Sequence, residues 1–480
     1  MRRTLVFIAT GALVVSACGR DKTETTKTTS PSGAPTTVAP AAAGLDQGAF
    51  GDLGVICKPA ADASKLTASD VGVTASEISI HTFSDPGYSG RLGLNQEMFD
   101  TATAFSAWCN EHGGINGRKI NPTLSDGKLF EAQQRMVEAC DGKAFMLVGG
   151  GNVFDDSIQK DRLGCKNGAL PQVAAYLVTA QAADSELTRV PVPNPGNQQP
   201  TGALKFLGEK FPDTTQAIGV LTGALPTTKV VAQRNIEAMK SLGWKVIYEG
   251  EYSPAGETSW RKFVTDMQTK GVKGLYWVGE PTNLALLLSE AKGLGLNLDW
   301  YAADANHYDN QLFAEDSASV SNVFVRSIFY PFLDEADANK NVASKQYREI
   351  VQTYGKDSKK IAYLGNQALS AWLLWAKAAG DCGADLTRDC VWEKIASVTS
   401  WTGGGLHAET DPGSGKASNC FNLLEAKGGK FTLVDIKADR GVYNCTEGNV
   451  MELKGDYGTG EKCPNAAYAT DPKPSTCNKQ

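Results

Sequence analysis

The stretch "AIGVLTGALPTTKVVAQRNIEAMKSLGWKVIYEGEY", residues 217–252, indicates the fold most directly. It opens with a short apolar run, 217–221, and closes with a run rich in β-branched and aromatic residues, 245–252. Between the two runs, four apolar residues recur at helical spacing: Val230, Ile236, Met239 and Leu242. A strand, a helix and a second strand in this order predict a β–α–β unit with two parallel strands.

The same alternation continues on both sides of this unit. Further short apolar runs occur at 78–83, 145–150, 173–176, 274–279, 300–304 and 323–330. Segment 99–114 has helical spacing, and the runs divide into two blocks, 77–190 and 214–330. The Pro-rich "VPVPNPGNQQP", 190–200, separates the blocks and is typical of a crossing between lobes. We therefore predict an α/β fold with two Rossmann-like lobes, each built on a parallel sheet.

The N-terminus predicts export. Arg2 and Arg3 precede an apolar run, Leu5–Val15, which is shorter than the roughly 20 residues that span a bilayer. This order predicts a secretory signal over 1–17. The stretch that ends at Cys18 resembles the lipobox of bacterial lipoproteins, which implies lipidation of Cys18 and an extracytoplasmic protein anchored to the cell membrane. The Thr-, Pro- and Ala-rich segment 18–49 predicts a flexible tether.

Ten of the eleven cysteines remain after Cys18, and an exported location permits disulfides. Three pairs would each close a short loop: Cys382 with Cys390, Cys420 with Cys445, and Cys463 with Cys477. Cys109 with Cys140 would link two successive helices, which leaves Cys57 for Cys165, although spacing does not fix connectivity. The sequence has no CxxC pair and its four histidines are scattered, so we expect no metal and no other cofactor.

The length and the net charge of the chain limit its possible partners and its domain organisation. The net charge is −6 and no basic run stands out, so nucleic acid is not an expected partner. About 430 residues follow the tether, too many for one ordinary core. We expect a first lobe over 50–195, a second over 196–335, a returning segment over 336–435 that completes both lobes, and a Cys-rich C-terminal extension over 436–480. The role of that extension stays open.

The glycine-rich stretch "CNEHGGINGRKI", 109–120, follows a helix and precedes a strand, the reverse of a phosphate-binding loop. We expect Gly113 to stop the helix and Asn116-Gly117 to form a turn. This stretch and "FMLVGGGN", 145–152, resemble the first lobe of type I periplasmic-binding proteins of the leucine/isoleucine/valine-binding kind. Further segments resemble the same family in the same order, and the likeness runs from about 77 to about 435: "DPGYSG" (85–90), 242–279 and "WTGGGLHAETDPG" (401–413).

The resemblance implies a solute receptor of an ABC importer. Its two lobes would close on a small amino-acid-like ligand, a branched-chain amino acid or a related amino acid or amide, and deliver it to a membrane permease. No G-x-S-x-G motif occurs and no histidine is placed as a base, so we do not expect an enzyme. The alternative is a sensory or scaffold lipoprotein of the same fold that regulates a signalling or cell-envelope partner.

Ligands of such sheets bind beyond the carboxyl ends of the strands. In the family, first-lobe loops receive the ligand carboxylate, and by position the matching residues are Gly150, Gly151, Asn152, Tyr176 and Thr179. An acidic second-lobe residue pairs with the ligand ammonium, which implies Glu280, with Asp304 as the alternative. Ser89 would line the cleft mouth. Leu225 and Thr227 stand where the family usually has a tyrosine.

Each of these residues also has a structural explanation. Glu280 could favour a helix dipole, Asn152 could be an N-cap, and Tyr176 could edge the core. The loop "GGGNVFDD" has no hydroxyl before Ser157, which weakens the case for a plain branched-chain amino acid. Another amino acid, an amide or a small organic acid would also suit this pattern.

Overall fold

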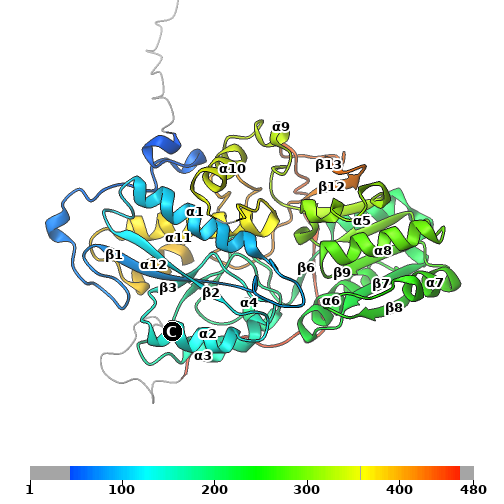
Figure 1. The fold of residues 1–480 in the computed structure, drawn as a ribbon, viewed down its shortest axis with the longest axis horizontal. Helices are drawn as coiled ribbons and strands as arrows, with labels where there is room; N and C mark the ends of the chain where they lie inside the picture. Colours follow the sequence, from blue (N-terminus) through cyan, green and yellow to red (C-terminus); the bar gives the residue numbers. More distant parts are fainter. Residues whose placement is uncertain (1–43, 357, 465–480) are drawn as a thin grey trace, which may run out of the picture. The chain divides into compact units, whose positions relative to one another are not determined.

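The computed structural model describes residues 44–356 and 358–464. Several predictions fall outside these residues: the signal over 1–17, lipidation of Cys18, nearly all of the tether over 18–49, and Cys477. The described residues contain two main sheets and a two-stranded ribbon (Figure 1).

The first sheet is parallel throughout, in the order β2-β1-β3-β4-β5. Its strands are β1 Glu77–Ser84, β2 Lys119–Asp126, β3 Met146–Val148, β4 Gln172–Val173 and β5 Thr188–Arg189. Four helices connect or follow these strands: α1 Gln96–Glu111, α2 Ala132–Asp141, α3 Gln159–Leu163 and α4 Ala180–Ala183. Parallel strands with helical crossovers are what the alternating apolar runs predict.

Helices from late in the chain complete this first lobe. α10 Val342–Tyr354 and α11 Tyr363–Asp381 pack with α1, α12 Arg388–Ala396 packs with α11, and α11 also contacts β3 and β4. Their apolar faces share one core cluster with the strands, which includes Trp108, Met146 and Trp372. α2 covers the opposite face through a smaller cluster around Met136 and Leu147. We call the first sheet with α1–α4 and α10–α12 the first lobe.

The second sheet has the order β13-β12-β11-β10-β9-β7-β8. Its parallel strands are β7 Ile218–Gly223, β8 Val246–Tyr252, β9 Gly274–Val278, β10 Trp300–Ala303 and β11 Val323–Ser327. The accompanying helices are α5 Gly202–Lys210, α6 Pro226–Ser241, α7 Arg261–Lys270 and α8 Pro281–Gly293. α6 and α8 both begin at a proline, which suits the first helical position because no N–H is needed there. This sheet and these helices form the second lobe.

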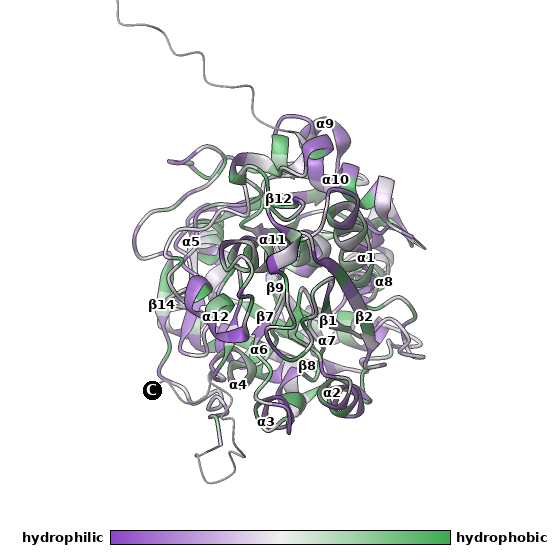
Figure 2. Ribbon diagram, turned by 90° about the vertical axis from the view of Figure 1, so that its left-hand side faces the viewer, coloured by the Kyte–Doolittle hydropathy of each residue, from purple (hydrophilic) through white to green (hydrophobic). Residues whose placement is uncertain are grey.

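Burial accounts for the strand pattern. Every residue of β7 and β9 is buried, as expected for central strands covered on both faces. Both hydrophilic and hydrophobic colours occur on the outer helices in Figure 2, such as α2, which buries only one side. The ribbon β14 Val450–Glu452 pairs antiparallel with β6 Gln198–Pro200, close to the crossing between lobes.

The second sheet departs from the prediction at one edge. β12 Asn422–Lys427 and β13 Lys430–Leu433 join it antiparallel, where the sequence pattern predicts parallel strands only. A tight turn at Gly428 and Gly429, both at positive φ, connects them and permits an antiparallel hairpin. The segment after residue 381 is thus partly built into a core, since Leu423, Leu424 and Ala426 are buried.

The glycine-rich stretch 109–120 is a helix stop and a turn, as expected. α1 ends at Glu111, and Gly113 and Gly114 have φ of 98° and 71°. Asn116 and Gly117 also have positive φ, inside a bridge between Ile115 and Arg118. A Cβ on Gly113 would lie 2.5 Å from the backbone nitrogen of Pro59, so the position requires glycine.

The disulfides are partly as expected. Cys382–Cys390 and Cys420–Cys445 are confirmed, and Cys463 is disulfide-bonded, although its expected partner Cys477 lies outside the described residues. The other two pairings are wrong: the structure joins Cys57 to Cys109 and Cys140 to Cys165. Segment 44–58 packs beside the end of α1, where Lys58 N–H donates to the Gly114 carbonyl, and the Cys140 sulfur at the end of α2 lies 3.8 Å from the Asp161 carbonyl oxygen on α3.

The C-terminal segment 450–463 contacts both lobes. On the second lobe, the Glu237 carboxylate of α6 accepts hydrogen bonds from the backbone N–H groups of Lys454 and Gly455 and from the Tyr457 hydroxyl. On the first lobe, the backbone N–H of Glu461 donates to the Ser185 hydroxyl at 2.9 Å. The segment therefore runs past the crossing and is held on either side of it.

Glu237→Ala should lower the free energy of unfolding by about 1–2 kcal/mol, because three donors lose a charged acceptor. Hydrogen bonds from Lys454 and Tyr457 hold the pKa of Glu237 below its ordinary 4.5, so this contribution is present above pH 4.5 and is lost as the pH falls. Urea unfolding at pH 7 and pH 3 measures both effects. Glu209→Ala, at an exposed position on α5, is the control, and an equal loss in the two variants would contradict the prediction.

No helix among residues 44–356 and 358–464 is long and apolar enough to cross a membrane.

Candidate functional site

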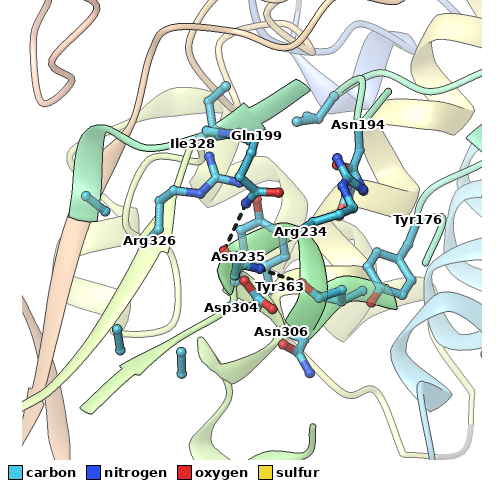
Figure 3. A pocket seen from close by; sticks show the side chains of 18 of the residues that line it. Tyr176, Asn194, Gln199, Arg234, Asn235, Asp304, Asn306, Arg326, Ile328 and Tyr363 are labelled. Atoms are coloured by element: carbon cyan, nitrogen blue, oxygen red, sulfur yellow. Dashed lines mark hydrogen bonds between the residues drawn. The ribbon is translucent and has the colours of Figure 1, made fainter. Parts of the chain in front are cut away.

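A cavity of about 140 Å³ lies where the two lobes meet the crossing segments (Figure 3). The first lobe contributes Tyr176, which follows β4, and the start of α11. The second lobe contributes α5, α6 and the ends of β10 and β11. The crossing segment 190–200 lines the cavity as well. Its position beyond strand ends, between two lobes, is that of a ligand site in open parallel sheets.

Asp304 and Tyr276 form the acidic part of the cavity. The Tyr276 hydroxyl donates to one Asp304 carboxylate oxygen at 2.7 Å, and the second oxygen has no hydrogen bond among the described residues. Burial raises the pKa of Asp304, although Tyr276, Arg326 and Arg234 act in the opposite direction. One acceptor oxygen is therefore left for a ligand.

Two arginines form the basic part. Arg234 on α6 donates to the carbonyls of Pro195 and Gln198 at 2.8 and 2.6 Å, while its Nε is buried without a partner. Arg326 on β11 is partly exposed, and within the described part of the chain its guanidinium has neither a hydrogen bond nor an ion pair. In Figure 3 its side chain extends from the strand towards Gln199. Arg326 is the cation of the site with the most unused donors.

The remaining wall is mostly apolar. It contains side chains from α5, α6, the crossing and the second sheet: Val190, Val192, Ala203, Leu204, Leu207, Val231, Phe324, Ile328 and Leu423. Several of these belong to the core cluster between α5, α6 and the second sheet, so the wall is fixed by packing. The site can therefore hold a molecule with a polar end and an apolar body.

Of the residues predicted from the sequence, Tyr176 and Asp304 line this cavity, from opposite lobes. The others lie elsewhere. Ser89 is exposed, Leu225 is the N-cap of α6, and Thr227 is buried on that helix with no hydrogen bond to its hydroxyl. None of these three is among the residues that line the cavity.

The first-lobe loop 150–152 is engaged internally. The Gly151 N–H donates to the Phe83 carbonyl at 2.9 Å, and the Asn152 amide donates to the Ser84 carbonyl and to Asp85. A Cβ on Gly150 would lie 2.4 Å from the Phe83 nitrogen, so this glycine allows the loop to pack directly on β1. The loop lines a separate, smaller cavity of about 20 Å³ among first-lobe residues.

The donors around Thr179 are also occupied, by Asp155. Its buried carboxylate accepts from the Val178 N–H at 2.5 Å, the Thr179 N–H at 3.3 Å and the Thr179 hydroxyl at 2.7 Å. Burial raises the pKa of Asp155 to about 7, against the effect of these hydrogen bonds. The chain's own carboxyl group thus fills the position that the resemblance assigns to a ligand carboxylate.

Glu280 is likewise paired within the protein. Its carboxylate contacts the guanidinium of Arg91, which also donates to Gln311. Arg91 lies in the loop after β1 and Glu280 directly follows β9, so the pair joins the two lobes. Of the two acids considered from the sequence, Asp304 lines the cavity and Glu280 does not.

Sequence reasoning missed Arg234, Tyr276, Arg326 and Asp155. Arg326 carried a usable signal, because a lone charge inside the apolar run "VFVRSIFY" points out of the core or into a site. Tyr276 lies within a buried strand and Arg234 on a helix, and nothing in their local patterns distinguishes them.

None of the four histidines of the chain lines the cavity. His407 and Ser370 are hydrogen-bonded at 2.8 Å but are both fully enclosed, and burial lowers the pKa of His407 to about 4. A buried, neutral pair away from the cavity serves packing and not nucleophilic chemistry.

The family model described as "periplasmic binding protein" matches residues 88–430. The Leu/Ile/Val-binding protein homolog 1 of Brucella abortus (strain 2308) is 23% identical over 276 residues, 56% of this chain and 70% of the relative. A fatty acid ABC transporter substrate-binding protein from Thermomonospora curvata aligns with a TM-score of 0.62 at 14% identity, covering 78% of this chain and 97% of that one. A branched chain amino acid ABC transporter from Thermus thermophilus with bound valine aligns with a TM-score of 0.60 at 14% identity, covering 75% and 96%.

Proposed function

Because the chain belongs to the periplasmic binding protein family, we propose that it is the extracytoplasmic solute receptor of an ABC importer. The family is one of solute-binding proteins, not enzymes. The ligand is a small molecule with a carboxylate, an amino acid or a related organic acid, and it binds in the cavity between the lobes. The proposal includes attachment to the membrane through lipidated Cys18 and delivery of the ligand to a permease.

The main support for the proposal is that residues from both lobes line the same cavity. Tyr176 reaches it from the first lobe, and Asp304 and Arg326 reach it from the second (Figure 3). A ligand that contacts both sides binds the closed arrangement better than the open one, and this difference in affinity drives closure. The names of the structural relatives, which include ABC transporters for a fatty acid and for a branched chain amino acid, support import.

Thermal unfolding of the oxidised chain in the presence of amino acids, amides and organic acids tests the proposal. A true ligand at a hundredfold excess over its Kd should stabilise the protein by about 2.7 kcal/mol. Cells that lack the protein should also lose uptake of that ligand. If no compound raised the melting temperature, the receptor function would be refuted. If a compound bound without any change in uptake, the import role would be wrong while binding stood.

A further inference from the structure

We propose that the ligand is a monocarboxylate with an apolar body and no ammonium group. This inference rests on the proposed function and narrows the ligand class of the same cavity. It follows from which charges of the protein are already paired and which are not.

The carboxylate cradle of the first lobe, formed by the N–H groups of Val178 and Thr179 and the Thr179 hydroxyl, is already occupied. These groups hold the carboxylate of Asp155. Asp155 is 1% exposed, so a ligand carboxylate would have to displace a buried side chain from its hydrogen bonds. The ligand carboxylate must therefore find its donors elsewhere.

The acids near the cavity offer no unpaired negative charge for a ligand ammonium. Glu280 is neutralised by Arg91, so it does not provide an unpaired negative charge. Asp304 faces two cations across the cavity, Arg234 and Arg326, and its carboxylate already accepts the Tyr276 hydroxyl. No acid of the cavity is left without a compensating positive charge.

The residues that line the cavity carry a net positive charge. Arg234 and Arg326 contribute two positive charges and Asp304 one negative charge, so the ionised lining carries +1, while Asp184, outside the lining, also attracts Arg234. A zwitterionic amino acid adds no net charge, so this excess is then offset only from outside the lining, by Asp184. A monoanion cancels it, which is the favourable arrangement at low dielectric.

Arg326 provides the matching donor. It lies on β11, one strand from β10, which ends just before Asp304, and no described residue accepts from its guanidinium. Guanidinium and carboxylate form paired, charge-assisted hydrogen bonds. Leu204, Leu207 and Phe324 offer an apolar surface for the rest of the molecule, and 140 Å³ gives room for roughly ten water-sized groups.

Isothermal titration calorimetry of the full oxidised chain with matched pairs of ligands tests the inference. Each pair consists of an amino acid and its deaminated acid: leucine with 4-methylpentanoate, and phenylalanine with 3-phenylpropanoate. We expect at least one acid to bind about tenfold or more tightly than its amino acid. The amide 4-methylpentanamide should bind about a hundredfold more weakly than the acid, because it lacks the charge that Arg326 pairs with.

Arg326→Gln should weaken binding of the acid about a hundredfold, and Arg326→Lys should recover part of it. Arg261→Gln is the matched control, since Arg261 is an exposed surface residue of the second lobe that pairs with Glu290. Circular dichroism confirms that each variant is folded, and Arg326→Lys replaces Arg326→Gln if the latter is not.

The outcomes are distinct. Tighter binding of an amino acid or of the amide than of the acid would overturn the inference and leave the receptor function intact. Unchanged affinity in Arg326→Gln would overturn the assigned site. Failure of every acid, amide and amino acid to bind would overturn the inference and the proposed function together.

Discussion

Lys360→Met should lower the free energy of unfolding by about 3–5 kcal/mol. The Lys360 ammonium pairs with Glu97 and with Asp309, both at 2.8 Å. The two carboxylate side chains are only 4% and 6% exposed, so the substitution leaves two buried negative charges without their paired cation, and Arg91 is then the cation that still attracts both. Urea unfolding at pH 7 measures the loss.

Two further variants make this result specific. Lys345→Met removes a surface pair with Glu349, and should cost under about 1 kcal/mol because both groups are half exposed. Combining Lys360→Met with Glu97→Gln and Asp309→Asn removes the charges together and should restore much of the stability. A loss under about 1 kcal/mol for Lys360→Met would show that the triad is solvated in solution and does not tie α1 to the segment after β10.

Asp155→Ala should lower the free energy of unfolding by about 3 kcal/mol, because the N–H groups of Val178 and Thr179 become buried donors without an acceptor. The neighbouring Asp156, whose carboxylate has no hydrogen bond among the described residues, provides the control. Asp156→Ala should change stability by less than about 0.5 kcal/mol. Equal effects of the two substitutions would contradict the proposal that Asp155 holds the N–H groups of Val178 and Thr179.

The Asp155 effect should depend on pH in a definite direction. Burial raises the pKa of Asp155 from 3.8 to about 7, so between these values the native state holds a proton that the unfolded chain has released. The contribution of Asp155 to stability therefore falls as the pH rises from about 4 to about 7 and is constant above. The difference between the wild type and Asp155→Ala should be larger at pH 4 than at pH 8. A constant difference would rule out the raised pKa.

The sequence predicts the parallel part of the fold because buried strands of such sheets form continuous apolar runs. β7 and β9 are such runs, and both begin and end within a few residues of the prediction. β5 and β6 contain two and three residues, too few for any periodicity. β12 was missed because its apolar residues follow a Gly- and Cys-rich segment that is typical of loops.

The disulfides and the candidate site also depend in part on long-range contacts that local sequence patterns do not reveal. Pairs that close short loops, such as Cys382–Cys390, follow from spacing. Cys57–Cys109 depends on packing of segment 44–58 against α1, which no local pattern reveals. Tyr176 and Asp304 were placed at the cavity because both follow strands. The pairing of Glu280 with Arg91, residues from different lobes, required the structure.

A crystal structure of the chain with its tightest-binding acid tests the central claim most directly. We expect ligand density between Tyr176 and Asp304, with the carboxylate on the Arg326 guanidinium and the apolar body against Leu204 and Leu207. Asp155 should still be bound to Thr179. Density outside this cavity, or a ligand carboxylate on the Val178 and Thr179 N–H groups with Asp155 displaced, would contradict it.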